Sequence, residues 1–209
     1  MGIKDWSRQR RDMVALLKRT GIQDSLVLQA MGVVERHRFV PLRHRYQRLE
    51  DPYCDHPLPI GCDQTISQPF VVAYMLEKLK LVAGEKVLEV GTGSGYVAAV
   101  LDEMGINVFT VEIIKELACR AEEIMGDKVH LRIGNGYAGW PEKAPFDAII
   151  LSCAPRSIPE NLTTQLKDGG RMILPAGDRD QRLVMVTRTG ADIIMQEDIP
   201  VRFVPMVHR

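Results

Sequence analysis

A glycine-rich turn between a short apolar run and a helical pattern constrains the fold of this chain more than any other feature. Residues 87–96 read Val-Leu-Glu-Val-Gly-Thr-Gly-Ser-Gly-Tyr. Glycine adopts backbone torsions closed to other residues and lets the main chain approach a ligand closely. The helix that follows offers unpaired N–H groups at its start. A strand, a glycine turn and a helix in this order predict a nucleotide-binding α/β fold.

An acidic residue further along the chain indicates which kind of nucleotide is bound. Glu112 ends the next apolar run, 21 residues after Gly91, and an acid there can accept hydrogen bonds from both ribose hydroxyls of an adenosine. The glycine spacing is G-x-G-x-G rather than the G-x-G-x-x-G of dinucleotide dehydrogenases, and Glu89 lies two residues before the first glycine. These features favour a methyltransferase over a dehydrogenase. Glycines that serve only helix–strand packing are the structural alternative.

Strands and helices alternate from residue 85 onward. The predicted strands cover residues 86–90, 107–112, 128–133, 146–152 and 171–175, and the predicted helices cover 95–104, 115–125 and 158–167. Such alternation predicts a parallel sheet with helices on both faces. Residues 182–189 and 194–207 flank a Thr-Gly-Ala-Asp turn and predict a closing antiparallel hairpin. This α/β pattern, a Rossmann-like doubly wound and mostly parallel sheet ended by a hairpin, resembles the class I S-adenosylmethionine-dependent methyltransferase fold.

The first 80 residues follow a different pattern. Two apolar stripes predict helices, with Asp24 as the N-cap of the second. A loop rich in Pro and Arg follows, and residues 55–61 are too rich in proline for a helix or a central strand. A third helix is expected from Pro69 to Lys80. We expect one domain over residues 1–209, in which residues 1–80 form a helical and substrate-loop extension and residues 81–209 form the cofactor-binding core.

Composition excludes several classes of protein. The chain is 45% hydrophobic and 26% charged, as in ordinary soluble proteins. It has no apolar run of the roughly 18 residues that a membrane-spanning helix needs, and no apolar signal region at its start. The four cysteines form no C-x-x-C pair and show no metal-ligand spacing with the histidines. We therefore expect a cytoplasmic protein with free thiols and no metal, with pairing of Cys54 and Cys62 as the alternative.

Charge is unevenly distributed along the chain. Residues 1–50 carry 11 Lys and Arg against 5 Asp and Glu, although the net charge of the whole chain is zero. A basic segment of this kind suits nucleic acid or an acidic protein surface. The alternative is a solvated helical face, which we favour, so nucleic acid is not an expected partner.

One longer block is more specific than the glycine turn. Residues 57–69 read Pro-Leu-Pro-Ile-Gly-Cys-Asp-Gln-Thr-Ile-Ser-Gln-Pro. This block is similar to the Pro-Leu-Pro-Ile-Gly…Gln-Thr-Ile-Ser-Gln-Pro block of the protein-L-isoaspartate O-methyltransferase family. Further matches are the turn at 91–96, Phe-Asp-Ala-Ile-Ile at 146–150 and Val-Arg-Phe-Val-Pro at 201–205. The resemblance covers nearly the whole chain, and its Thr-Ile-Ser segment is uncommon outside the family.

The resemblance implies a reaction and a set of site residues. The cofactor would be S-adenosyl-L-methionine, and the partners would be isoaspartyl-containing proteins or peptides, methylated on their free α-carboxylate as a step of protein repair. The methyl ester then collapses to a succinimide, which can reopen as normal aspartate. Ser67 would be the active-site residue. Expected cofactor contacts are Thr65, Ile66, Glu89, Val90, Gly91, Thr92, Gly93, Ser94, Gly95, Glu112, Ile113, Asn135 and Gly136. Expected substrate contacts are Gln64, Ser67, Arg202, Val204 and Pro205.

Three residues depart from the family pattern. Asp63 stands where the family usually has glycine, Phe70 replaces a common histidine beside the cofactor, and Asn135 replaces the aspartate of Gly-Asp-Gly. A carboxylate at position 63 is expected to repel a carboxylate substrate. These changes leave a non-catalytic or retargeted S-adenosylmethionine-binding protein as one alternative. A methyltransferase for RNA or a small molecule is the other, although residues 152–155 match its Pro-Pro-aromatic motif poorly.

The expected chemistry needs few catalytic groups. A carboxylic acid has a pKa of about 3.5–4 and is already a nucleophile at neutral pH, so no general base is required. The enzyme must instead align the carboxylate oxygen with the methyl group. Ser67 precedes Gln-Pro and an apolar helical run, so it can also cap that helix. We expect it to do both.

Overall fold

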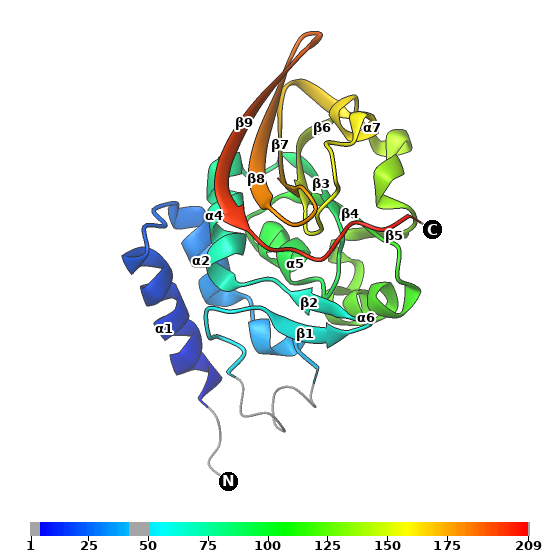
Figure 1. The fold of residues 1–209 in the computed structure, drawn as a ribbon. Helices are drawn as coiled ribbons and strands as arrows, with labels where there is room; N and C mark the ends of the chain where they lie inside the picture. Colours follow the sequence, from blue (N-terminus) through cyan, green and yellow to red (C-terminus); the bar gives the residue numbers. More distant parts are fainter. Residues whose placement is uncertain (1–4, 42–50, 209) are drawn as a thin grey trace.

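A seven-stranded sheet forms the centre of the molecule (Figure 1). The computed structural model describes residues 5–41 and 51–208. The strands of the sheet are β3 (Lys86–Val90), β4 (Asn107–Glu112), β5 (His130–Ile133), β6 (Phe146–Leu151), β7 (Leu166–Ala176), β8 (Gln181–Thr189) and β9 (Asp192–Val201). Their order is β5-β4-β3-β6-β7-β8-β9, with β3 to β7 parallel and the β8–β9 hairpin antiparallel. The predicted mostly parallel sheet and its closing hairpin are confirmed.

The strand order reverses beside β3. The chain moves outward from β3 to β4 and β5, and then returns to place β6 on the other side of β3. Connections from β3 and β6 therefore leave in opposite directions and open a crevice at the carboxyl ends of these strands. Ligands of open α/β sheets bind at such a point. The glycine-rich turn follows β3 directly, so the topology places it in this crevice.

Helices cover both faces of the sheet. The helices are α1 (Trp6–Arg19), α2 (Ser25–Val33), α4 (Pro69–Leu79), α5 (Tyr96–Glu103), α6 (Lys115–Met125) and α7 (Glu160–Thr163). Short 3-10 turns are η1 (Arg36–Phe39), η2 (Gly126–Lys128), η3 (Gly136–Ala138) and η4 (Pro141–Lys143). Alternate residues of β3 point to opposite faces, so Val87 belongs to the hydrophobic cluster that contains residues of α1, α2, α4, α5 and α6, whereas Leu88 belongs to the cluster that contains a residue of α7.

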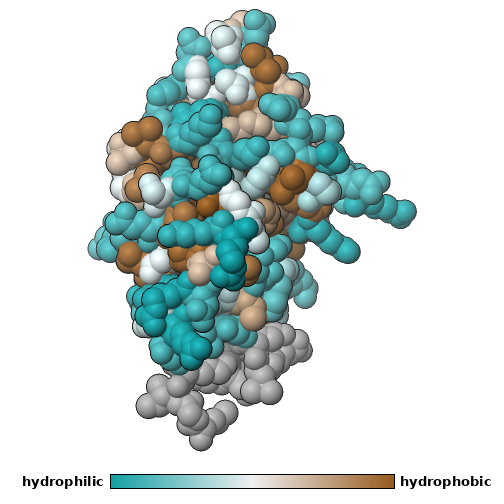
Figure 2. Space-filling view, turned by 90° about the vertical axis from the view of Figure 1, so that its left-hand side faces the viewer, coloured by the Kyte–Doolittle hydropathy of each residue, from teal (hydrophilic) through white to brown (hydrophobic). Residues whose placement is uncertain are grey.

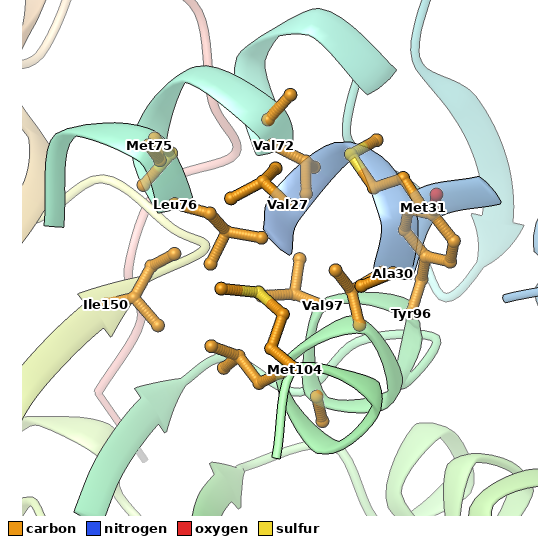
Figure 3. Close-up of a cluster of buried hydrophobic side chains, with 14 of the residues drawn as sticks. Val27, Ala30, Met31, Val72, Met75, Leu76, Tyr96, Val97, Met104 and Ile150 are labelled. Carbon is orange, nitrogen blue, oxygen red and sulfur yellow. The ribbon is translucent and has the colours of Figure 1, made fainter. Parts of the chain in front are cut away.

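The N-terminal helices share a core with the sheet. In Figure 3, side chains from α2 (Val27), α4 (Leu76) and α5 (Val97) meet beside Ile150 of β6. Leu76, Val27 and Ile150 are at most 1% exposed. Side chains on both sides of residue 80 thus belong to one hydrophobic cluster, and neither part would bury its apolar face alone.

A small hairpin precedes α4. β1 (Leu58–Gly61) pairs antiparallel with β2 (Gln64–Ile66) in a sheet of two strands. The connecting residues Cys62 and Asp63 both have positive φ, 53° and 56°, as a two-residue hairpin turn of this twist requires. Asp tolerates this conformation better than most residues, which gives a structural reason for an aspartate where the family usually has glycine.

Three predicted elements are wrong in extent, and one of them is the strand predicted over 171–175, which is only the second half of β7. The helix predicted over 158–167 is only α7, because β7 begins at Leu166 and pairs there with Phe146. The strand predicted over 194–207 ends at Val201, and beyond it the chain turns to form a single parallel bridge between Pro205 and Ala154. Most of the loop rich in Pro and Arg lies at residues 42–50, outside the described residues.

The outer face of the molecule beside α1, α4 and β9 is mostly hydrophilic, and its hydrophobic side chains gather in several separate groups (Figure 2). Within the part of the chain that the structure describes, no helix is both long and apolar enough to cross a bilayer.

We propose that the shared core makes the chain one folding unit, and its two tryptophans provide the test. Trp6 lies in α1 and Trp140 packs edge-on against Phe109 of the sheet, so Trp140→Phe and Trp6→Phe leave one reporter in each part. In urea, the fluorescence midpoint of each variant is expected to coincide with its own circular dichroism midpoint. A Trp6 transition that precedes the loss of sheet signal would divide the chain into two units.

Candidate functional site

A cavity lies in the crevice at the carboxyl ends of β3, β4 and β6. It is lined by Gln64, Thr65, Ile66, Ser67, Glu89, Val90, Gly91, Thr92, Gly93, Ser94, Tyr96, Val97, Val111, Glu112, Ile113, Ile114, Leu117, Gly136, Ser152, Cys153, Val204, Pro205, Met206 and Val207. We call it the nucleotide cavity. Eleven of the thirteen predicted cofactor contacts lie in its wall; the exceptions are Gly95 and Asn135.

The glycine turn forms one side of the nucleotide cavity. Gly91 and Gly93 have φ of 91° and 54°, a conformation that other residues adopt at a cost. Gly136 also lines the cavity, and glycine is needed there for a different reason. A side chain there would begin 2.5 Å from a Val90 methyl carbon and 3.1 Å from Met206 Cε. The glycine at 136 is thus required by close packing against Val90 and Met206 in the cavity wall.

Glu112 holds the turn from the neighbouring strand. Its Oε2 accepts a hydrogen bond from Gly93 N (2.8 Å) and its Oε1 accepts one from Ile114 N (2.9 Å). Each carboxylate oxygen keeps a second lone pair for a ligand hydroxyl. The geometry suits a ribose diol, and the same bonds fix the loop around it. A glutamine here would set an amide N–H against a backbone N–H, so it would disturb the loop as well as the ligand.

Glu89 is fully buried at the end of the cavity. Its Oε2 accepts from Thr110 Oγ1 (2.7 Å), which in turn contacts Thr92 Oγ1 (2.6 Å), and Ser152 Oγ donates to Oε1 (3.4 Å). Burial raises the pKa of Glu89 to about 8, and the nearby Glu112 carboxylate adds to the rise, while the Thr110 hydrogen bond opposes it. A cationic ligand group beside it would favour the ionised form.

Gly95 and Asn135, which lie outside the cavity wall, have structural roles. Gly95 is the N-cap of α5 with φ of 87°, and a side chain there would meet Met125 Sδ at 3.0 Å. Its glycine is therefore explained by the packing of α5 on α6. Asn135 Oδ1 accepts from Tyr137 N (2.9 Å) and caps η3, next to Gly136 in the cavity wall.

A second cavity, of about 530 Å³, adjoins the first. It is lined by Pro57, Thr65, Ser67, Gln68, Phe70, Val71, Ser152, Ile199, Pro200, Val201, Arg202, Phe203 and Val204. We call it the peptide groove. Thr65, Ser67, Ser152 and Val204 lie in both walls, so the two cavities meet there. Of the predicted substrate contacts, Arg202, Ser67 and Val204 line the groove, whereas Gln64 and Pro205 line the nucleotide cavity but not the groove.

Ser67 is not the helix cap that its position predicts. The N-cap of α4 is Gln68, and the N–H of Phe70 is capped by Asp55 Oδ1 (2.8 Å). Asp55 is distant in sequence, so a local pattern could not reveal it. Among the described residues the Ser67 hydroxyl has no hydrogen-bond partner, and Ser67 lines both cavities. Its carbonyl accepts from Nη2 of the buried Arg36 (2.8 Å).

The segment after β9 lines both cavities. Gln181 holds it by a pair of bonds, accepting from Phe203 N (2.6 Å) and donating to Phe203 O (3.1 Å). Ala154 holds it from the other side through Val204 O and Met206 N (both 2.8 Å). The anchors leave Arg202 N and O and Val204 N without hydrogen bonds to described residues.

Comparisons with known proteins agree on one family. Residues 8–209 match the family model described as protein-L-isoaspartate(D-aspartate) O-methyltransferase. The chain belongs to the protein-L-isoaspartate O-methyltransferase family. A family member from Gloeobacter violaceus is 53% identical over 196 residues, 91% of this chain and 94% of that protein. One from Parvibaculum lavamentivorans is 45% identical, covering 96% and 92% of the two chains.

Solved structures of the same description share the fold. One protein-L-isoaspartate O-methyltransferase has a TM-score of 0.86 at 28% identity, covering 95% of this chain and 66% of that chain. A second, from Plasmodium falciparum in complex with S-adenosyl-L-homocysteine, has a TM-score of 0.82 at 27% identity, covering 95% and 98%. The predicted class I methyltransferase fold and the family resemblance are confirmed.

Several residues of this family member escaped prediction from the sequence. Ser152 and Cys153 follow β6 directly and line the nucleotide cavity. Their position at the carboxyl end of a parallel strand could have predicted a place in the site, because ligands of this fold bind there. Burial, with the Glu112 and Glu89 carboxylates, raises the pKa of Cys153 to about 12, so this thiol stays protonated at neutral pH. All four cysteines are free, as predicted. In the described residues no group of three metal-ligating side chains comes together.

The raised pKa of the buried Glu89 predicts how the stability of the cofactor-free protein depends on pH. The folded protein retains a proton up to about pH 8 that an ordinary glutamate loses near 4.5. The stability tied to that proton is fully present below about pH 4.5 and is lost as the pH rises through about 8. Glu89→Gln removes the titration, so its Tm should fall less than that of the wild type between pH 6 and 9. Parallel melting curves over this range would contradict the assignment.

Proposed function

We propose that this family member transfers the methyl group of S-adenosyl-L-methionine to the free α-carboxylate of L-isoaspartyl residues in damaged proteins or peptides. One observation carries the proposal: the nucleotide cavity and the peptide groove share a wall at Thr65, Ser67, Ser152 and Val204. A methyl donor in the first cavity and an acceptor chain in the second meet at this wall. The family relationship supports the identity of both.

The residues of the nucleotide cavity fit the cofactor. Glu112 would bind the ribose hydroxyls through the free lone pairs of its oxygens, and the backbone at Gly91 and Gly93 would lie against the cofactor. Gly136 would line the adenine, with Asn135 next to it holding η3. Glu89 would face the positive end, where an ionised carboxylate is favoured. The remaining predicted contacts, Thr65, Ile66, Val90, Thr92, Ser94 and Ile113, complete the wall, and Gly95 positions α5.

The peptide groove offers separate groups for the carboxylate and the main chain. The Ser67 hydroxyl is free to donate to the isoaspartyl carboxylate. Arg202 N and O and Val204 N are free to pair with an extended peptide, as in strand addition. Phe203 cannot take part, because both its backbone groups are bound to Gln181. Pairing of the substrate is therefore limited to alternate residues, with Pro205 and Gln64 behind it at the cofactor side.

Alignment accounts for the chemistry without a general base. Bound S-adenosylmethionine supplies a methyl group made electrophilic by its sulfonium. The acceptor carboxylate is ionised at neutral pH, so Ser67 orients it and need not remove a proton. Holding both reactants at the shared wall replaces a bimolecular encounter by an oriented one, an effect large enough to carry much of the rate.

The departures from the family pattern leave this reaction intact. Asp63 is exposed at the tip of the β1–β2 hairpin and lines neither cavity, so its carboxylate does not face the substrate. Phe70 lines the peptide groove rather than the nucleotide cavity. Neither residue supports a non-catalytic role. Isoaspartyl chains remain the proposed partners, and the cytoplasmic location stays a prediction.

The decisive assay compares two peptides that differ only in the linkage at one residue. With tritiated cofactor, kcat/KM for an isoaspartyl peptide is expected to exceed that for its normal aspartyl twin by at least about 100-fold, because polar groups matched to one backbone are left unpaired by the other. Bulk RNA serves as the negative control. Equal rates on the two peptides would defeat the isoaspartyl assignment and leave only the methyltransferase fold.

Ser67→Ala tests the carboxylate contact, and the structure makes it a clean change because no helix cap is lost. A hydrogen bond to a charged group contributes about 1.5–3 kcal/mol, so kcat/KM should fall by about 10-fold or more with Tm and cofactor affinity unchanged. Ser7→Ala, on the exposed face of α1, is the matched control. Asp55→Ala removes the true cap and should instead lower the Tm. Turnover of Ser67→Ala above about a third of wild type would show that Ser67 is not a substrate contact.

A further inference from the structure

A third cavity, of about 900 Å³, lies on the far side of the segment after β9. Three arginines line it, and each comes from a different loop: Arg156 follows β6, Arg179 lies between β7 and β8, and Arg202 follows β9. The first two loops leave the carboxyl ends of parallel strands, the edge of the sheet where ligands of this fold bind. We call it the arginine cavity.

The three arginines have no acidic partners among the residues that the structure describes. All three are exposed, and none forms an ion pair or side-chain hydrogen bond with any residue in the described ranges. By contrast, Arg171 and Arg182 of the neighbouring strands are paired with Glu85 and Glu197. Asp178 is the acidic residue in the lining, so the arginines outnumber the acids. A carboxylate entering the cavity would break no existing pair.

The arginine cavity is continuous with the peptide groove. Val201, Arg202 and Phe203 line both, and among the described residues Arg202 is the charged side chain that lines the groove. A chain bound in the groove with its isoaspartyl residue at Ser67 would leave the groove toward Arg156 and Arg179. Arg binds carboxylates through two parallel hydrogen bonds, which matches acidic side chains on such a chain.

We propose that the arginine cavity binds acidic side chains that flank the isoaspartyl residue, so that the enzyme selects acidic segments of its substrate proteins. The inference rests on the proposed function, because it places the substrate chain in the peptide groove. It names a substrate class: isoaspartyl sites followed or preceded within a few residues by Asp or Glu.

The test uses two matched pairs of isoaspartyl peptides, with Glu or Gln at flanking positions on the N-terminal or the C-terminal side. For one side, kcat/KM of the wild type is expected to favour Glu by about 5-fold or more, and the preference should shrink as salt is added. Arg156→Gln with Arg179→Gln should abolish the preference and leave the rate on the Gln peptide within about 2-fold. Arg11→Gln, on the exposed face of α1, should keep the preference.

Binding measured by fluorescence anisotropy separates this inference from the proposed function. If no isoaspartyl peptide is methylated, the proposed function fails, yet labelled Glu and Gln peptides still report on the cavity by their Kd. Equal Kd and kcat/KM for Glu and Gln on both sides would overturn the inference. So would a preference that the double variant retains, or a short single-stranded RNA that binds through Arg156 and Arg179 while acidic peptides do not.

Discussion

The buried guanidinium of Arg36 joins the N-terminal extension to both parts of the site. Its Nε donates to Pro52 O (2.7 Å), its Nη2 donates to Ser67 O (2.8 Å), and its carbon lies 4.9 Å from the centre of the Tyr96 ring. Burial lowers the pKa of Arg36 to about 10, so it remains a cation at neutral pH. Removing one partner of a buried charge is costly, which makes these contacts mutually dependent. Tyr96 begins α5 after the glycine turn, so one residue fixes the substrate serine relative to the cofactor loop.

The sheet and the C-terminal segment complete that alignment. Reversal of strand order at β3 opens the crevice for the cofactor, and the hairpin β8–β9 returns the chain so that residues 201–207 close it. Gln181 and Ala154 hold the segment through its backbone. The cofactor and the acceptor are thus brought together by walls that come from six separate segments of the chain, and the reaction needs little beyond this placement.

Prediction from sequence succeeded where the signal was local. The glycine turn, Glu112 and the strand–helix alternation each follow from a short pattern, and the bounds of β3 and β4 match those expected. It failed where a partner came from far away. Ser67 has the sequence of a helix cap, yet Asp55 provides the cap from across the β1–β2 hairpin. Arg36 and Gln181 carry no sequence signature of their roles, because their partners lie 31 and 22 residues away.

The same limit applies to β7 and β9. Leu166 has helical neighbours in sequence, but pairing with Phe146 in the sheet decides its conformation. The sequence up to Val207 has the pattern of a strand, but β9 ends at Val201. The chain then turns so that Pro205 pairs with Ala154, a distant contact that the local pattern does not indicate. Tertiary packing overrides local propensity at such positions.

The central claim is that this site works by alignment of an already ionised nucleophile, and the pH dependence of kcat tests it most directly. With an isoaspartyl peptide and saturating cofactor, kcat should be flat from about pH 6 to 9, because the carboxylate titrates well below that range. A rate that rises tenfold per pH unit across it would show that a proton must be removed from the nucleophile, and would contradict the account.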